Sequence, residues 1–559
     1  MSDLRQRLEV LLADLYPTQP GVVLAQLLEL AEAYRTRLDG RVVDALTQRS
    51  SFLITYGDSI RRPGETPLHT LRGLLDDRVG ELISDVHLLP MFPWTSDDGF
   101  AVVDHRLVNP DLGDWDDVAD LAEHRSLMFD FVANHTSSSS PWFQGWLDDA
   151  PAFAGFYVER DLDFDVSNVV RPRTSALFHQ YDKASGGSAW AWTTFGADQV
   201  DVDVRNPAVL LELTDVLLGY LARGASSLRL DAIGFLWKES GTTCLHLPQT
   251  HAVIKIWRAL VDHVAPGAQL ITETNVPHRD NISYFGDGHD EATMVYQFAL
   301  PPLVLHSFVS GSTERLSTWA ASIGPVSDTA TWFNFLASHD GVGLRPTEGI
   351  LDDEQRQALV ERTRAHGGEV SMAARADGGQ SVYELNVSYL DALCSPEELL
   401  DEQVVVAKAL AAHSILLSVL GVPAIYIHSL LGSHPDHAGM ASTGIHRRIN
   451  RAVLDADALL GELTTDARRS GVFAGILELL AHRRQQPGLS PYGSQEVLRL
   501  DDRVFAVRRG AATPDELVCV TNVTADTVVI EQVVGTDVLA GRRVEPLVLP
   551  GFGFAWVSP

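Results

Sequence analysis

Three acidic residues each follow a short apolar run of the kind that forms a buried strand. Asp231 ends the run SSLRLD, Glu273 ends QLITE and Asp340 ends WFNFLASHD. One carboxylate in such a place is usually a helix cap or a loop residue, whereas three of them favour a shared site. A pair of carboxylic acids can break a glycosidic bond with retention, one as the nucleophile and one as the acid/base. A third carboxylate can hold sugar hydroxyls and stabilise a cationic transition state.

Arg229 precedes Asp231 by two residues. Side chains alternate along a strand, so we expect these two to point to the same face. A neighbouring guanidinium holds a carboxylate in its ionised form, which a nucleophile needs at neutral pH. The motif alone is equally compatible with a structural ion pair. Glu273 would need the opposite influence, burial beside other carboxylates, to keep a proton that it can donate.

The strands that carry these residues alternate with helices along the chain. Short apolar runs predict strands at 52–56, 85–90, 126–134, 226–234, 269–275, 332–340 and 422–427. Helical spacing lies between them, for example over 68–79 and over 206–225. Strands that alternate with helices form parallel sheets. The predicted fold class is therefore α/β, a (β/α)8 TIM barrel, in which the chemistry occurs at the carboxyl ends of the strands.

The barrel does not account for the whole chain, and we predict five segments. Residues 1–48 are predicted to form a helical N-terminal extension, and 49–488 the catalytic (β/α)8 barrel. Two polar stretches that interrupt the alternation predict an inserted domain B at 136–200 and an inserted loop subdomain at 343–405. Short strands separated by turn residues replace the helical signal near residue 490, so 489–559 are predicted to form a C-terminal antiparallel β-domain.

Charge and cysteine content exclude several classes of protein. A formal net charge of −31 makes nucleic acid and anionic membranes unsuitable partners. The three cysteines are far apart and fit neither a disulfide framework nor a zinc site, which favours a reducing compartment. No apolar run approaches the roughly 18 residues of a membrane span, and the N-terminus does not resemble a signal peptide. We expect a cytoplasmic protein. The sequence leaves the oligomeric state open, and the N-terminal helices and the C-terminal β-domain are the two candidate interfaces for a homodimer.

Four short segments resemble the signature regions of the α-amylase superfamily, glycoside hydrolase family 13. They are DFVANH at 130–135, LRLDAIG at 228–234, TETN at 272–275 and FLASHD at 335–340, in the order that the family shows. Each segment alone is a weak signal, and the four together are a strong one. The resemblance implies that Asp231 is the nucleophile, Glu273 the acid/base and Asp340 the transition-state stabiliser. It also implies that three residues bind the glucosyl unit at subsite −1, namely Arg229, His135 and His339.

Further segments resemble the sucrose phosphorylase subfamily over roughly residues 50–455. They include HLLPMFPWTSDDGF at 87–100, VVRPR at 169–173 and FGADQVDVDV at 195–204. The resemblance implies that Asp97 holds glucose hydroxyls at the closed end of a pocket for one glucose. Phe100 would be the apolar platform under the sugar ring, with Phe195 and Gln199 nearby.

Phosphorolysis requires inorganic phosphate to displace water as the acceptor, so phosphate must be bound and oriented. In a protein of net charge −31 this requires local positive charge. Arg173 in VVRPR matches the phosphate-contacting arginine of the subfamily, and Tyr383 in VYELN matches a loop tyrosine that approaches phosphate. A guanidinium fork suits phosphate oxygens.

The chain departs from sucrose phosphorylase on the acceptor side. Asn275 and Glu384 stand where that enzyme carries His and Gln. Additional arginines follow in the chain, namely Arg345, Arg447, Arg448 and Arg451, and we assign Arg451 to the substrate-binding set. This combination most resembles the glucosylglycerate phosphorylases, which implies 2-O-α-D-glucosylglycerate as the preferred α-glucoside and D-glycerate as the small acceptor.

Other functions share most of these residues. Sucrose, sucrose 6′-phosphate and glucosylglycerol phosphorylases are the nearer alternatives, and an α-glucosidase or transglucosidase is a more remote one. A catalytically inactive binding subunit is disfavoured because Arg229, Asp231, Glu273 and Asp340 are all intact. Some α-amylases use the Asn of the first signature for calcium, and Asn134 keeps that residue type. The sucrose phosphorylase branch works without calcium, so no metal and no cofactor are predicted.

Overall fold

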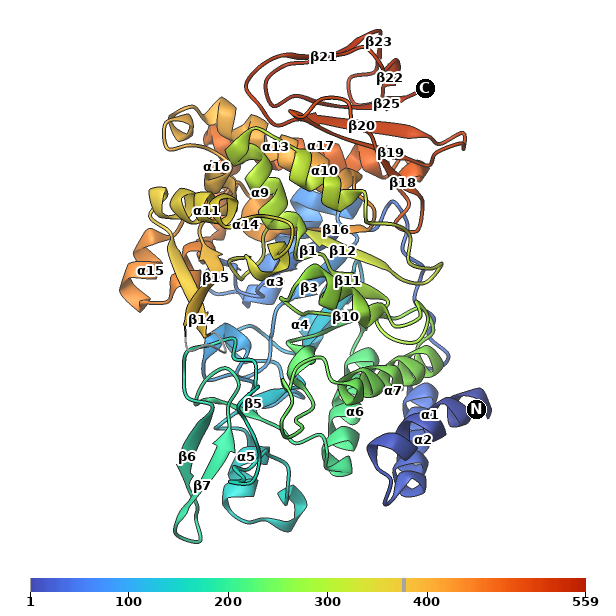
Figure 1. Cartoon of the computed structure of the whole chain (residues 1–559), viewed down its shortest axis with the longest axis vertical. Helices are drawn as coiled ribbons and strands as arrows, with labels where there is room; N and C mark the ends of the chain where they lie inside the picture. Colours follow the sequence, from blue (N-terminus) through green and yellow to red (C-terminus); the bar gives the residue numbers. More distant parts are fainter. Residues whose placement is uncertain (1, 375–378) are drawn as a thin grey trace.

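The computed structural model describes residues 2–374 and 379–559. Its centre is a closed barrel of eight parallel strands (Figure 1), which the chain visits in sequence order. β1 closes the barrel by pairing with both β3 and β16. The strands are β1 Phe52–Thr55, β3 Asp85–Leu88, β4 Ser126–Phe131, β9 Ala225–Leu230, β10 Gln269–Thr272, β11 Met294–Tyr296, β12 Thr331–Phe335 and β16 Val422–Tyr426. This arrangement confirms the predicted (β/α)8 fold.

Seven of these strands coincide with apolar runs in the sequence, whereas β11 was not predicted. β11 has three residues, all of them buried, and a run of that length has no readable periodicity. It is held in place by its neighbours, because it pairs with β10 on one side and β12 on the other. The eighth strand is therefore defined by closure of the barrel rather than by a local signal.

Helices cover the outside of the barrel. α6 (Pro207–Ala222) begins where the sequence predicted, because the Asn206 side chain accepts a hydrogen bond from the Ala208 amide and caps the first turn. The other principal helices around the barrel are α3 Pro67–Leu74, α4 Trp115–Ala122, α7 Pro248–Val264, α9 Leu300–Ser310, α10 Glu314–Ala320, α13 Glu402–Ser418, α14 Ile427–Leu430, α16 Ala456–Thr465 and α17 Ala467–Arg483.

Two N-terminal helices, α1 (Ser2–Leu15) and α2 (Pro20–Arg37), lie against α6 and α7 (Figure 1). Their buried faces are mostly leucine, and the Tyr34 hydroxyl donates a hydrogen bond of 2.8 Å to Asp215 on α6. They lie outside the ring of barrel strands, and the turn between them reaches the segment before α6, where the Tyr16 hydroxyl donates a hydrogen bond of 2.7 Å to the Val204 carbonyl. They add apolar contacts on the outer side of α6 and α7 rather than residues of a site.

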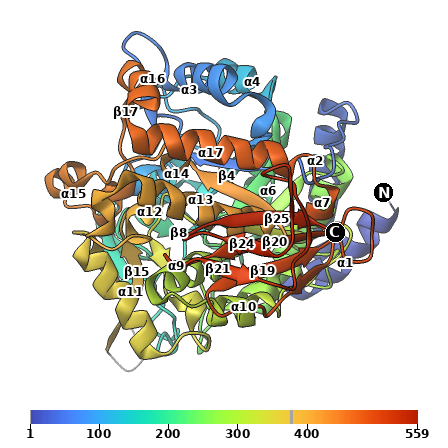
Figure 2. The same cartoon turned by 90° about the horizontal axis from the view of Figure 1, so that it is seen from above.

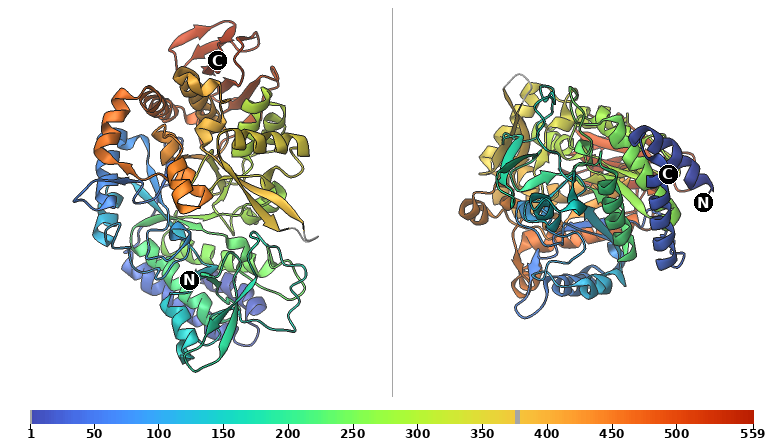
Figure 3. Two further views of the ribbon diagram at one scale, coloured as in Figure 1. Left: turned by 90° about the vertical axis from the view of Figure 1, so that its left-hand side faces the viewer. Right: turned by 90° about the horizontal axis from the view of Figure 1, so that it is seen from below.

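Two insertions follow β4 and β12, and both lie at the mouth of the barrel. The first contains β5 His135–Ser137, α5 Pro141–Leu147, β6 Phe178–Asp182, β7 Ser188–Trp192 and β8 Gln199–Asp201. The second contains β13 Val342–Gly343, α11 Asp353–Ala365, β14 Glu369–Ala374 and β15 Gln380–Asn386, so it holds a helix and a three-stranded sheet as well as loops. Residues 375–378 of the predicted subdomain lie outside the described residues. Figure 3 shows the two insertions on the same side of the molecule.

The C-terminal segment forms antiparallel sheets, as predicted. The larger sheet has the order β18 Gln495–Val497, β19 Val504–Arg509, β20 Leu517–Asn522, β25 Phe554–Ser558, β22 Gly535–Asp537 and β23 Arg542–Val544. β21 Val528–Ile530 pairs with β24 Leu547–Leu549. The larger sheet packs on α13 (Figure 2). There the buried Trp556 indole donates a hydrogen bond of 3.1 Å to the Ser414 hydroxyl. Across the described residues, every helix is too short or too polar to cross a membrane.

Candidate active site

A pocket of about 690 Å³, counting its open mouth, lies at the carboxyl ends of the barrel strands. Eleven of the fourteen predicted site residues line it, namely Asp97, Phe100, His135, Arg173, Gln199, Asp231, Glu273, Asn275, His339, Asp340 and Tyr383. Arg229 lies buried directly beneath the pocket. Glu384 and Arg451 lie behind its wall, where they contact lining residues. The structure thus brings the predicted set together around one cavity.

The Arg229 guanidinium joins the two carboxylates that the sequence singled out. Its Nη1 atom is 2.7 Å from Asp231 Oδ1, and Nη2 is 3.7 Å from Glu273 Oε2. The same Nη1 atom contacts Asp130, whose other oxygen is 2.6 Å from His87 Nε2. β4, β9 and β10 are adjacent in the barrel, which is why residues so far apart in sequence meet here. Asp231 and Glu273 therefore flank a single space.

The backbone beyond β9 turns sharply to complete this contact. Ala232 adopts a left-handed conformation (φ 47°), which is unfavourable for a residue with a Cβ. In this conformation its amide donates a hydrogen bond of 2.9 Å to Glu273 Oε2. The residue after Asp231 thus fixes the direction of the Glu273 carboxyl.

Protonation of the pair follows from its surroundings. Burial raises the pKa of both Asp231 and Glu273, and Arg229 opposes the rise at each. With three carboxylates around one guanidinium, a proton is shared within the cluster. Asp231 has the 2.7 Å contact to Arg229 and Glu273 the 3.7 Å contact, so the proton is better placed on Glu273. This is the division of roles that a nucleophile and an acid require.

Aromatic and neutral polar groups form the floor and one wall of the pocket. The Phe100 ring stacks on His339 with centroids 5.0 Å apart, and the His135 ring lies near Phe195. Burial lowers the pKa of both His135 and His339, so both rings are neutral at pH 7. Gln199 Nε2 donates to Asp97 Oδ2 at 3.2 Å. These groups offer an apolar platform and hydrogen-bonding atoms suited to a sugar.

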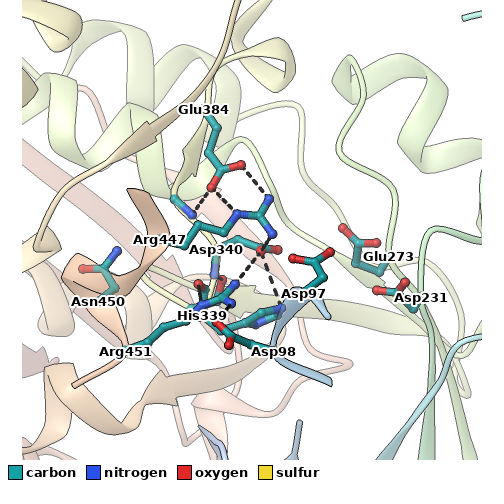
Figure 4. Close-up of polar contacts among 12 residues, drawn as sticks. Asp97, Asp98, Asp231, Glu273, His339, Asp340, Glu384, Arg447, Asn450 and Arg451 are labelled. Atoms are coloured by element: carbon teal, nitrogen blue, oxygen red, sulfur yellow. Dashed lines mark hydrogen bonds and ion pairs between the residues drawn. The ribbon is translucent and has the colours of Figure 1, made fainter. Parts of the chain in front are cut away.

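Asp340 is bound by arginines from the segment at 446–451 (Figure 4). Arg447 Nη1 lies 2.7 Å from Asp340 Oδ1, and the rest of its guanidinium binds Glu384 at 2.7 and 2.9 Å. Burial acts to raise the pKa of Asp340, but Arg447 and Arg451 outweigh it and the pKa falls below its usual range. Asp340 is therefore ionised, and Glu384 is turned toward Arg447 rather than toward the cavity.

The neighbouring Asp98 holds the same segment from the other side. It contacts Arg448, and its Oδ2 atom is 2.6 Å from Arg451 Nη1. The Nε atom of Arg451 donates to the His339 carbonyl at 2.7 Å. Asp97 and Asp98 both have a positive φ, so the turn points one carboxylate into the pocket and the other into this network.

Arg173 and Tyr383 lie together on another side of the pocket. The Arg173 guanidinium lies 5.6 Å from the centre of the Tyr383 ring and 5.9 Å from that of Phe195. Within residues 2–374 and 379–559, no carboxylate lies within ion-pair distance of Arg173. Burial raises the pKa of Tyr383 to about 12, so its hydroxyl stays a hydrogen-bond donor. A positive charge and a hydroxyl therefore face the cavity together.

Asn134, in the first of the four signature segments, is bound by an amine of the chain itself. Lys238 Nζ donates to Asn134 Oδ1 at 2.9 Å and lies 2.7 Å from Asp201 Oδ2. Lys238 and Asp201 are both buried. Among the described residues no group of three metal-ligating side chains is present.

Sequence reasoning missed several of these residues. Asp98 stands beside Asp97, and the sequence gives no sign that the two point in opposite directions. Arg447 belonged to a recognised arginine cluster, but it is Arg447 rather than Arg451 that lines the pocket. Lys238 lies in the loop after β9, where nothing in the local pattern distinguishes a buried lysine from an exposed one.

Fold and pocket together define a (β/α)8 barrel of the glycosidase type, with paired carboxyl groups at the strand ends. A family model described as "Alpha amylase, catalytic domain" matches residues 80–341. The glucosylglycerate phosphorylase of Allomeiothermus silvanus is 43% identical over 99% of each chain. The sucrose phosphorylase of Agrobacterium vitis is 32% identical over 71% of this chain and 81% of its own. The crystal structure of a sucrose 6F-phosphate phosphorylase from Thermoanaerobacter thermosaccharolyticum has the same fold, with a TM-score of 0.76 at 22% identity over 90% of this chain and 99% of its own.

The chain therefore belongs to the α-amylase family, glycoside hydrolase family 13. Within that family, three proteins named glucosylglycerate phosphorylase are 43–46% identical to it over 84–99% of this chain. Proteins named for sucrose, sucrose 6-phosphate or glucosylglycerol are more distant, at 26–32% identity. The predicted family membership is confirmed.

Proposed function

We propose that this chain is a retaining glycoside phosphorylase, which transfers an α-glucosyl unit to inorganic phosphate and yields α-D-glucose 1-phosphate. The observation that carries the proposal is Arg173, a cation without a carboxylate partner among the described residues, in the pocket that Asp231 and Glu273 share. A hydrolase needs no such charge, whereas phosphate must be bound and oriented to compete with water. Net charge −31 makes a local cation all the more necessary.

The reaction would proceed through two inversions. Asp231 attacks the anomeric carbon while Glu273 gives its proton to the leaving alkoxide, and a β-glucosyl ester of Asp231 forms. Phosphate, held by Arg173 and Tyr383, then attacks from the vacated side, and Glu273 takes up a proton from it. Asp340, Asp97, His135 and His339 would hold the glucosyl hydroxyls, with Phe100 and Gln199 completing the pocket. Arg229 would keep Asp231 ionised.

We propose 2-O-α-D-glucosylglycerate as the preferred substrate and D-glycerate as the acceptor in the reverse direction. Support comes from the names of the relatives at 43–46% identity and from Arg345, which lines the pocket. The proposed substrate-binding set also includes Asn275, which would contact the ligand directly. Glu384 and Arg451 would act indirectly, Glu384 by holding Arg447 and Arg451 by holding His339. No metal or cofactor is proposed.

An acceptor panel tests the proposal. The enzyme is incubated with α-D-glucose 1-phosphate and D-glycerate, glycerol, fructose or fructose 6-phosphate, and phosphate release is measured. We expect release with D-glycerate at a much lower acceptor concentration than with the others. Release with fructose alone would overturn the substrate and leave the mechanism intact. Release of free glucose with every acceptor would indicate an α-glucosidase instead.

We propose the five-segment division at residues 48, 136–200, 343–405 and 489. A cytoplasmic location is supported by the three cysteines, which are all unpaired and buried. A homodimer stays a prediction, and light scattering of the purified protein measures it.

A further inference from the structure

Three arginines line the pocket in the described part of the chain, and they differ in what already neutralises them. They are Arg173, Arg345 and Arg447. Arg447 is fully engaged, with Asp340 at 2.7 Å and both oxygens of Glu384 within 3 Å. Arg448 and Arg451, which the sequence grouped with it, are engaged by Asp98. Arg447, Arg448 and Arg451 are therefore already paired with carboxylates of the protein and are not free to receive an anionic ligand.

Arg345 is not held in this way. Its single ion pair within the described residues is with Glu348, at 3.9 Å from Nε, and the Glu348 side chain is half exposed. An exposed pair at that distance has little net energy. The positive charge of Arg345 is therefore available at the pocket surface.

The position of Arg345 is on the acceptor side. The Leu344 amide donates to the Tyr383 carbonyl at 3.1 Å, which ties this segment to the strand that carries Tyr383. Gly343 lies directly against Asn275, since a Cβ at Gly343 would come within 2.6 Å of Asn275 Oδ1. Asn275 in turn follows Glu273 by two residues. The group that receives a proton from Glu273 must leave on this side, so Arg345 is near the leaving group rather than near the glucose.

Asn275, next to this segment, has a side-chain oxygen without a hydrogen-bond donor in the described part of the chain. Its Oδ1 atom is buried and has no hydrogen-bond partner among the described residues. A buried acceptor without a donor costs free energy until a ligand supplies one. Arg345 also lines a second hollow beside the pocket, together with Arg171 and Arg356, so its guanidinium stands where the two spaces meet.

Resting on the proposed function, we propose that Arg345 is the residue that selects the acceptor, by binding its carboxylate. Asn275 Oδ1 accepts a hydrogen bond from a hydroxyl of the same small molecule. Arg173 and Tyr383 then serve phosphate, so that the two anions, which react in different half-reactions, are recognised by different cations. Selection rests on the carboxylate because D-glycerate differs from glycerol in that group.

The test compares D-glycerate with glycerol as acceptors for glucosyl transfer from α-D-glucose 1-phosphate. We expect R345Q to raise the KM for D-glycerate by about 10- to 100-fold, the effect of losing a charge-assisted hydrogen bond. The preference for D-glycerate over glycerol should fall by the same factor. R345K keeps the charge but loses the fork, and it should lie between R345Q and the wild type.

R356Q is the matched control. It removes one positive charge from the neighbouring hollow, where Arg356 is bound to Asp353 and to the Leu351 carbonyl. It should leave both acceptors unchanged, and thermal unfolding checks that all three variants are folded.

Two failures are distinguishable. If wild-type enzyme transfers glucose to D-glycerate and R345Q does so with the same KM, Arg345 is not the selecting residue, although the proposed function stands. If wild-type enzyme releases phosphate from glucose 1-phosphate but never forms a D-glycerate product, the acceptor itself is wrong: the D-glycerate assignment and the role of Arg345 both fall, and the phosphorylase mechanism stands.

Discussion

The two ends of the pocket handle charge in opposite ways. At the proposed glucose end, Asp340 in the pocket and Asp98 behind its wall are each paired with arginines from the segment at 446–451. At the acceptor end, Arg173 has no carboxylate partner within the described residues, and Arg345 has a loose one. The charged groups at the glucose end are therefore paired with one another, whereas the two arginines at the acceptor end lack a close carboxylate in the part of the chain that the structure describes.

The difference matches the ligands that we propose. Glucose is neutral, so a network that satisfies its own charges can hold dipoles in place without attracting ions. Phosphate and a carboxylate are anions, and an uncompensated cation in a protein of net charge −31 gives them a local attraction. Removing one partner from the complete network leaves a buried charge unpaired, whereas removing a cation from the open end weakens binding alone.

The largest effect is expected from D231A. The variant cannot form the glucosyl ester, so we expect the rate of phosphorolysis to fall by roughly 10⁴-fold or more. Arg229 keeps its contact with Asp130, so the fold should persist, and circular dichroism and thermal unfolding check this. A variant with half the wild-type activity would end the assignment of Asp231.

E273Q should have the next largest effect, about 10²- to 10⁴-fold on kcat, because the leaving alkoxide loses its proton donor. Burial raises the pKa of Glu273, and the protonated form is the acid, so wild-type activity should fall as the pH rises through that pKa. The alkaline limb of the pH–rate profile should disappear in E273Q. α-Glucosyl fluoride, whose leaving group needs little protonation, should be affected far less; an equal loss with both donors would contradict the role.

D98N removes the carboxylate that pairs with Arg448 and Arg451 near the glucose end of the pocket. It leaves Arg451 buried without its 2.6 Å partner, and we expect about 2–4 kcal/mol lower stability to chemical denaturation. The KM for the α-glucoside should also rise, because the Asp97 turn loses its anchor. R543Q removes an exposed pair with Glu545 in the C-terminal sheet and should change stability by less than about 1 kcal/mol. Equal effects of the two changes would refute the comparison.

R173Q tests the open end and should have the smallest effect on glucosylation itself. We expect the KM for phosphate to rise by about 10- to 100-fold, while the glucosyl-enzyme still reacts with water. The ratio of free glucose to glucose 1-phosphate should therefore increase, which chromatography of the products measures. R160Q, an exposed arginine of the same insertion that stacks on Trp190, is the control. An unchanged product ratio in R173Q would remove Arg173 from the phosphate site.

The strand ends were predictable because each proposed catalytic carboxylate closes an apolar run that is long enough to show a pattern. β11 was not, since its three residues are defined by pairing with β10 and β12. The residues that line the pocket were also largely predictable, but the ion pairs and hydrogen bonds among them were not. Which of Asp97 and Asp98 faces the cavity depends on two positive φ angles, and which arginine reaches Asp340 depends on a short helical turn at 446–450. Backbone conformations of this kind cannot be predicted from residue types or their spacing.

The buried amine of Lys238 has a consequence for the joint between the barrel and the first insertion. It ties Asn134, which follows β4, to Asp201 at the end of β8. A joint built on a bound ion would empty when the ion is diluted or chelated. The positive charge at this joint belongs to the Lys238 side chain, so every folded molecule has it whatever the ionic composition of the solution.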